Sequence, residues 1–160
     1  MRAIAMSRRN LLAVGTIALA GASSISATVR ARTQATRGAN NEEIVRRYYK
    51  AWEKKDWGPI DALLAENFTF TSANNYDHIT KSAFKTRCWE SQIGFIDHFE
   101  IERLMPQGDW AFVKYLCRTK NGKSFRNVEY LQFRGEKIAA IECYFGARSS
   151  FPSAVSTEQN

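Results

Sequence analysis

The stretch YYKAWEKKDWGPIDALLAENFTFTS, residues 48–72, changes its hydrophobic period twice and sets the order of the first elements. Leading into it, Ile44, Tyr48 and Trp52 recur every four residues, which predicts a helix with one broad apolar face. We expect a second, short helix after Asp56, because the proline that follows suits a first helical turn. The first two elements are therefore predicted to be helical.

The first helix has a predicted start, and a strand follows the second helix. Asn40, with Glu43 three residues later, is typical of a capping box. In NFTFTSA, Phe68 and Phe70 alternate with threonines, which predicts a strand. The segment ITKSAFKTRCW then fits a third helix capped by Thr80.

The rest of the chain is strand-like. Runs rich in β-branched and aromatic residues cover 96–105, 110–119, 124–133 and 138–145, and PQGD, KNGK and RGEK between them are typical of turns. Three helices, an early strand and an antiparallel meander predict one α+β domain, residues 41–148, long enough for a single core.

The N-terminus is predicted to be an export signal. In MSRRNLLAVGTIALAGA, residues 6–22, Arg8 and Arg9 precede a weakly hydrophobic, uncharged run that resembles a twin-arginine signal. We expect cleavage between Ser24 and Ala31, a periplasmic or secreted product, and the twin-arginine translocase as a partner; a Sec signal or an uncleaved anchor is the alternative. The segments assigned are a signal over 1–31, a polar linker over 32–40 and a polar tail over 149–160.

Charge and composition exclude several classes of function. The formal net charge is +7, but the four arginines of residues 1–31 leave only +3 on the remaining chain, so nucleic acid is not expected as a partner. Two histidines far apart do not predict a metal site, and no motif indicates a cofactor. Cys88, Cys117 and Cys143 are expected to be small buried residues, although Cys117 and Cys143 fall in predicted strands and could pair.

Two stretches resemble the nuclear transport factor 2-like superfamily, which includes ketosteroid isomerases and SnoaL-like polyketide cyclases. Residues 48–72 are similar to the helix, Asp, helix, strand progression of that superfamily. FRNVEYLQFRGEKIAAIECYFG, residues 125–146, is similar to its closing hairpin. The resemblance implies a cone-shaped, curved antiparallel sheet wrapped around three N-terminal helices, an apolar pocket inside it, and a homodimer.

The resemblance also implies roles for individual residues. Tyr48 and Glu129 match the two groups that donate hydrogen bonds to a developing oxyanion, while Ser72 stands where a carboxylate moves the proton. Serine is not a useful base unless another group activates it, so steroid isomerisation is disfavoured. Epoxide hydrolysis is also disfavoured. Cys143 lies near the position where epoxide-hydrolysing relatives have an acid, and cysteine cannot substitute for that acid.

The strand pattern gives an independent reason to consider Glu129. Alternation along FRNVEYLQF places Asn127 and Glu129 on one face with apolar neighbours. A buried carboxyl must pair, become neutral or face a wet cavity. The alternative to a pocket role is a structural ion pair with Arg126, Arg118 or Lys114, and Tyr48 could equally be a packing aromatic.

A replacement base and an apolar lining can be suggested. His78 beside Asp77 provides an imidazole that titrates near physiological pH, in an expected loop at the mouth of the pocket; a surface histidine is the alternative. Trp52, Trp89 and Tyr144 are candidate lining residues. We therefore expect a domain that binds a small apolar molecule, with proton transfer, isomerisation or cyclisation beside a carbonyl; the alternative is a non-catalytic ligand-binding or dimerisation module.

Overall fold

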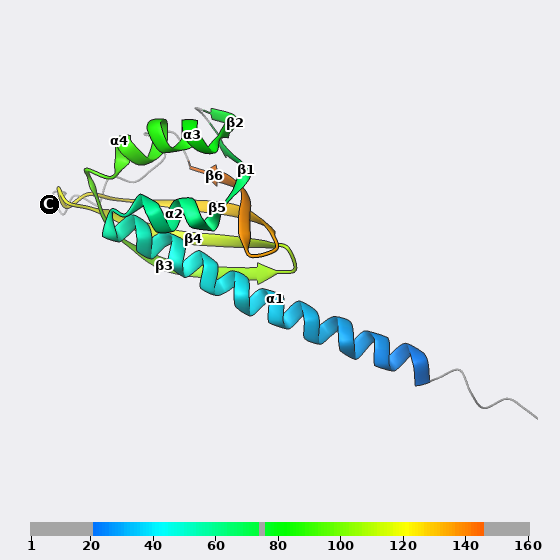
Figure 1. Cartoon of the computed structure of the whole chain (residues 1–160). Helices are drawn as coiled ribbons and strands as arrows, with labels where there is room; N and C mark the ends of the chain where they lie inside the picture. Colours follow the sequence, from blue (N-terminus) through cyan, green and yellow to red (C-terminus); the bar gives the residue numbers. More distant parts are fainter. Residues whose placement is uncertain (1–20, 74–75, 146–160) are drawn as a thin grey trace, which may run out of the picture.

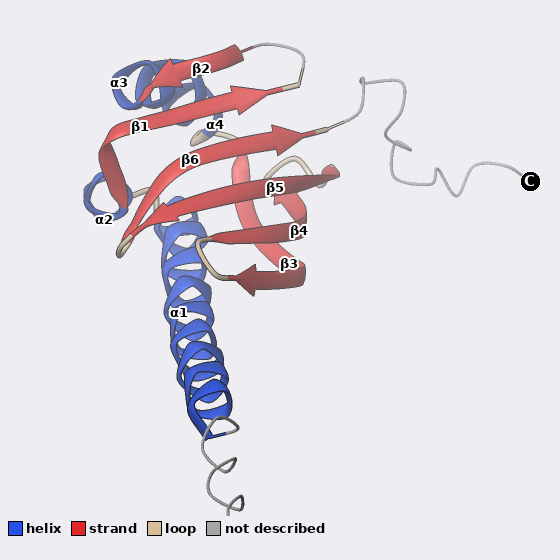
Figure 2. Cartoon of the chain, turned by 90° about the vertical axis from the view of Figure 1, so that its right-hand side faces the viewer, coloured by secondary structure: helices blue, strands red, loops and turns tan. Residues whose placement is uncertain are grey.

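The computed structural model describes residues 21–73 and 76–145, and these form helices packed against a curved six-stranded sheet (Figures 1 and 2). This confirms the predicted α+β cone. Most of the predicted signal and all of the predicted tail lie outside the described residues. None of the described helices is long and apolar enough to cross a membrane.

The first helix is longer than the sequence suggested. Helix α1 runs Gly21–Lys54, so Asn40 lies inside it rather than capping it, and residues 32–40 are helical rather than an irregular linker. These residues are mostly exposed, and their alanines, arginines and glutamine favour helix without needing a buried face. Figure 1 shows this half of α1 projecting away from the sheet. The Asn41 Nδ2 group donates to the Gly108 carbonyl at 2.8 Å and ties the helix to a turn of the sheet.

The C-terminal half of α1 carries the predicted apolar face into the core. Ile44, Tyr48 and Trp52 are at most 6% exposed, and the helix axis crosses the concave side of the sheet. The helix ends where Lys55 adopts a left-handed conformation, with φ of 58°. The amides of Lys55 and Asp56 donate back to Trp52 and Ala51, which is a Schellman arrangement.

A short second helix and a third helical segment complete the cover of the sheet. Helix α2, Trp57–Leu63, is capped by the Asp56 carboxylate, which accepts from the Gly58 amide. The third segment joins α3 (Lys81–Phe84), a π-helical turn (Lys85–Trp89) and α4 (Glu90–Gln92). Its predicted cap is confirmed, because the Thr80 hydroxyl accepts from the Ala83 amide at 3.3 Å.

The six strands follow the order β2-β1-β6-β5-β4-β3, with β1 and β6 parallel and the other neighbours antiparallel. The four strands expected after residue 95 agree with the structure to within two residues at each end. The bounds are β1 Leu64–Ser72, β2 Tyr76–Thr80, β3 Ile96–Gln107, β4 Trp110–Thr119, β5 Ser124–Arg134 and β6 Lys137–Tyr144.

Strand β2 was not predicted, and it changes the setting of one candidate pair. Asp77 and His78 lie on this edge strand rather than in a loop. The strand pairs with β1 through Thr80 and Ile79, and its few apolar residues give no alternation that a sequence pattern could reveal. The backbone of His78 is left-handed, with φ of 51°.

Candidate functional site

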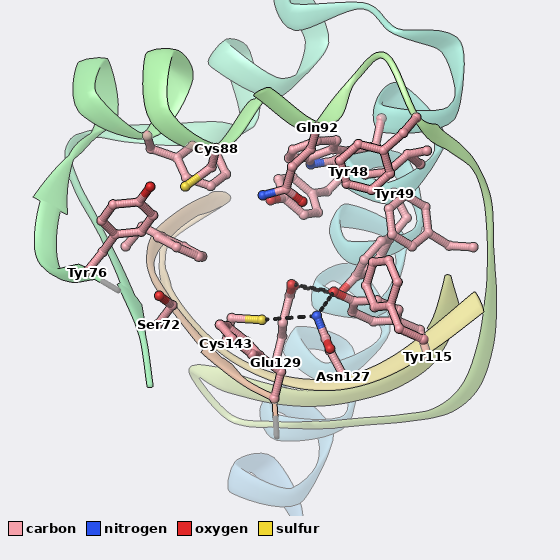
Figure 3. Close-up of a pocket in the computed structure, with 18 residues that line it drawn as sticks. Tyr48, Tyr49, Ser72, Tyr76, Cys88, Gln92, Tyr115, Asn127, Glu129 and Cys143 are labelled. Atoms are coloured by element: carbon pink, nitrogen blue, oxygen red, sulfur yellow. Dashed lines mark hydrogen bonds between the residues drawn. The ribbon is translucent and has the colours of Figure 1, made fainter. Parts of the chain in front are cut away.

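A cavity of about 460 Å³ opens between the concave face of the sheet, α1 and the third helical segment (Figure 3). Eleven of its eighteen lining residues are aromatic. Glu129 is the single carboxyl in the lining, and no lysine, arginine or histidine lines it within the described part of the chain. A largely apolar cavity with a few convergent polar groups is typical of a small-molecule site.

Strand register brings polar groups together on one side of this cavity. We call this side the floor, and it consists of Ser72, Cys143, Glu129, Asn127 and Tyr115. Pairing places Ser72 of β1 beside Cys143 of β6, and Cys143 beside Glu129 of β5. Two residues earlier on β5, Asn127 lies on the same face and pairs with Tyr115 of β4. The predicted alternation along β5 is therefore confirmed.

Two tyrosine hydroxyls hold the Glu129 carboxylate. Tyr49 on α1 donates to Glu129 Oε2 at 2.7 Å, and Tyr115 donates to Oε1 at 2.9 Å. The Asn127 Nδ2 group in turn donates to the Tyr115 hydroxyl at 3.0 Å and to Cys143 Sγ at 3.5 Å (Figure 3). Elements far apart in sequence thus meet in one connected network around a single carboxyl.

Burial dominates the electrostatics of Glu129, which is only 7% exposed. Loss of hydration raises its pKa, and the hydrogen bonds from Tyr49 and Tyr115 oppose only part of that rise. The same burial, with the nearby Glu129 charge, holds the pKa of both tyrosines well above the ordinary value. Glu129 is therefore the group of this network that titrates at the lowest pH.

The alternative of a structural ion pair for Glu129 is wrong. The three cations considered for it lie on the convex face of the sheet and pair with glutamates of β3. Arg118 contacts Glu100, while Arg126 and Lys114 both contact Glu102.

Comparison with protein families identifies the domain. The model of the SnoaL-like domain matches residues 45–141. The chain belongs to the SnoaL-like family.

Solved structures agree with this assignment at the level of fold. A nuclear transport factor 2-like protein of unknown function from Cytophaga hutchinsonii is 19% identical, with 68% of this chain and 91% of that chain covered and a TM-score of 0.57. An LEH-like epoxide hydrolase from M. tuberculosis is 16% identical, with coverages of 68% and 84% and a TM-score of 0.57. A de novo designed protein with a curved β-sheet is 17% identical, with coverages of 70% and 89% and a TM-score of 0.61. Comparison with curated proteins gives no match.

The tyrosine that the resemblance assigned to an oxyanion site, Tyr48, is not the helix tyrosine that contacts Glu129 in this SnoaL-like domain. Tyr48 lines the cavity and packs edge-on against Trp52, but the hydroxyl bonded to Glu129 belongs to Tyr49. Tyr115 was also missed, although its position opposite Asn127 on a predicted strand was a signal that could have found it. Both tyrosines donate to the protein's own carboxyl rather than to a ligand.

Some other expected residues of the SnoaL-like domain lie outside the cavity. Asp77 and His78 have largely exposed side chains, form a hydrogen bond with each other, and are not among the lining residues. Tyr144 is 50% exposed on the convex face and donates to Glu142. Tyr144 therefore does not line the cavity, contrary to the expectation. His78, the expected base, does not reach the cavity.

The remaining candidates fall on both sides of the cavity wall. Trp52, Ser72 and Asn127 line it as expected. Trp89 is buried behind the wall, with its ring centroid 4.6 Å from that of Trp52. Gln92, which sequence reasoning missed, points its amide into the cavity from the side opposite Glu129 (Figure 3).

The cysteines of the SnoaL-like domain are buried free thiols, as expected, and Cys117 and Cys143 form no disulfide. Burial raises the pKa of Cys88 to about 12 and raises that of Cys143 as well. Both thiols line the cavity. At neutral pH they are protonated and act as soft apolar groups rather than nucleophiles.

Proposed function

We propose that this SnoaL-like domain binds a small, largely apolar molecule in the cavity and that Glu129 exchanges a proton with it. The reaction class is isomerisation or cyclisation beside a carbonyl, without a cofactor. The supporting observation is one buried carboxyl, held by Tyr49 and Tyr115, within a wall of aromatic side chains. Burial raises the pKa of Glu129, which strengthens it as a base.

In the proposed step, the ionised Glu129 carboxylate removes a proton from the carbon next to a carbonyl. The C–H electron pair moves into the carbonyl group to give an enolate, and the proton held on Glu129 returns to a carbon of the same molecule. Tyr49 and Tyr115 keep the carboxylate oriented throughout. The enolate oxygen would point away from the floor, toward the Gln92 amide.

The test is hydrogen–deuterium exchange of 2-tetralone, a small aromatic ketone with acidic C–H groups, followed by NMR in D₂O. The protein should accelerate exchange, and Glu129→Gln should lower that rate by about 10²-fold or more, the usual contribution of a general base. His78→Ala is the matched control and should exchange at the unmodified rate. Loss of exchange in His78→Ala but not in Glu129→Gln would refute the assignment of the base.

Binding without chemistry is the second candidate. Ser72 favours this candidate. Its hydroxyl lies on the floor, where a second base would assist catalysis, but a serine hydroxyl is not a useful base unless another group activates it. In that case 2-tetralone would change the tryptophan fluorescence of the protein, because Trp52 lines the cavity, while its exchange rate stayed at the solvent background.

Export to the periplasm or beyond is part of the proposal, and the sequence of residues 6–22 supports it. Replacing Arg8 and Arg9 by lysines should retain the precursor inside the cell if the twin-arginine route is used. Unchanged export of the double variant would indicate a Sec signal instead.

A further inference from the structure

We propose that the ligand of this cavity is a small protonated amine with an apolar body, its N–H groups facing the acceptors of Glu129 and Asn127. The inference rests on the proposed function only in taking this cavity as the ligand site. It follows from a count of hydrogen-bond donors, from the sign of the charge on the lining, and from the nature of the walls.

The donors on the floor are already engaged. A tyrosine has one hydroxyl proton, and the protons of Tyr49 and Tyr115 both go to Glu129. An amide has two N–H protons, and the Nδ2 group of Asn127 has two acceptors, the Tyr115 hydroxyl and Cys143 Sγ. These groups therefore have no proton left for an oxyanion or a carbonyl oxygen.

Acceptors remain on the same floor. Asn127 Oδ1 and Ser72 Oγ are buried and have no hydrogen-bond partner within the described residues. Asn127 Oδ1 can only accept, whereas the Ser72 hydroxyl can accept or donate. Each Glu129 oxygen accepts one tyrosine bond and keeps a further lone pair. A buried polar atom without a partner is costly, so a ligand that brings donors to Asn127 Oδ1 and Glu129 binds better there than one that brings acceptors.

Charge selects an ammonium among possible donors. Glu129 has no ion-pair partner among the described residues, and no basic side chain of that part lines the cavity. A bound cation would supply the missing charge beside the carboxylate. Aromatic faces such as those of Trp52, Phe99 and Tyr48, which also line the cavity, attract a cation through their quadrupoles.

Proton exchange accompanies binding in a predictable way. Other titratable groups facing the cavity whose pKa burial raises are Tyr48 and Tyr49 on α1, Cys88 on the third helical segment, Tyr115 on β4 and Cys143 on β6. Glu129 is the single carboxyl among these groups, so it is the group whose protonation an arriving ammonium changes. Where Glu129 is protonated in the empty cavity, an arriving ammonium releases that proton to solvent. A substrate of the proposed reaction would then be an amino ketone.

The experiment compares four six-membered rings that differ only in the polar group: cyclohexylamine, cyclohexanol, cyclohexanone and cyclohexanecarboxylate. Binding to the full chain is measured by calorimetry near neutral pH, in two buffers of different ionisation enthalpy. The amine should bind more tightly than the alcohol by roughly tenfold or more, as expected for charge-assisted hydrogen bonds in a dry site. Its binding should also release protons at the lower pH values where Glu129 is protonated in the empty cavity.

Variants separate the carboxyl from the rest of the cavity. Glu129→Gln should remove most of the advantage of the amine over the alcohol and abolish the proton release. The control Glu102→Gln changes a glutamate on the convex face and should leave both unchanged. The ring series on the unmodified protein needs no variant, so the proposal stays testable even if Glu129→Gln does not fold.

The other outcomes overturn the inference in distinguishable ways. Equal affinity for amine and alcohol would show that charge plays no part, and tightest binding of the ketone or carboxylate would show that the floor presents donors. If no ring binds while Glu129 still catalyses exchange of 2-tetralone, the amine inference fails and the proposed function stands. If neither ring nor tetralone binds, both fail.

Discussion

The two faces of this sheet hold glutamates in opposite electrostatic states. On the convex face, Glu102 contacts Lys114 at 3.0 Å and Arg126 at 2.7 Å, and hydrogen bonds from these cations lower its pKa. On the concave face, Glu129 is buried, accepts hydrogen bonds from two tyrosine hydroxyls, and has a raised pKa. Glu102 on β3 and Glu129 on β5 are separated by the single strand β4, yet their pKa shifts have opposite signs.

The difference indicates that the concave face, rather than the convex face, is the functional one. The glutamates of β3 meet their cations across the convex face, so their charges are neutralised and solvated. On the concave face, no described cation pairs with Glu129, and the hydroxyls of Tyr49 and Tyr115 donate to it instead. A buried, unpaired acid is an expensive feature for a stable fold, and such features concentrate at functional sites.

The largest expected effect concerns pH and stability. The raised folded-state pKa of Glu129 means that its contribution to stability is fully present below the ordinary pKa of 4.5 and is lost as the pH rises through the folded-state value. Each unit of that rise is worth about 1.4 kcal/mol of unfolding free energy. Urea unfolding across this range should show the unmodified protein losing stability relative to Glu129→Gln as the pH increases.

Glu102→Gln supplies the opposite sign for the same measurement. Its lowered pKa makes the contribution of Glu102 present above the ordinary pKa and lost as the pH falls. A pH profile in which both variants move in the same direction relative to the unmodified protein would contradict the contrast between the faces.

The second effect concerns the donors to Glu129. Tyr115→Phe removes the hydrogen bond to Oε1 and the acceptor of the Asn127 amide, and should cost about 1–3 kcal/mol of unfolding free energy. It should also raise the pKa of Glu129 further, as measured by carboxyl NMR titration. Tyr130→Phe is the control, because Tyr130 packs on Phe112 at the convex face. An unchanged Glu129 pKa in Tyr115→Phe would show that the hydroxyl does not support the carboxylate.

Much of the fold could be predicted because its signals are local. The period of four in α1, the alternation in β5 and the glycine-containing turns each depend on neighbouring residues. The same alternation could have excluded Arg126 as a partner of Glu129, because consecutive strand residues point to opposite faces. Strand β2 could not be predicted, since a short edge strand with few apolar residues has no periodic pattern.

The contacts within the site depend on how elements are rotated against each other, which no local pattern specifies. Tyr48 and Tyr49 are adjacent, equally buried and both on the apolar side of α1. Only the rotation of the helix over the sheet decides which hydroxyl reaches Glu129. The side chain of Gln92 is likewise directed inward by a helical segment that contains a π turn, and its sequence carries no mark of that turn.

The smallest effect sharpens the comparison from the convex side. Glu102→Gln leaves Arg126 and Lys114 without their shared carboxylate, but all three side chains are partly solvated. The loss of stability should therefore be smaller than that of Tyr115→Phe, and it should vanish in about 1 M salt, where the screening length falls to roughly 3 Å. The effect of Tyr115→Phe should persist at the same salt concentration, because its hydrogen bond is buried. Urea unfolding of both variants at low and high salt measures this, and equal salt sensitivity would mean that the two faces screen their glutamates alike.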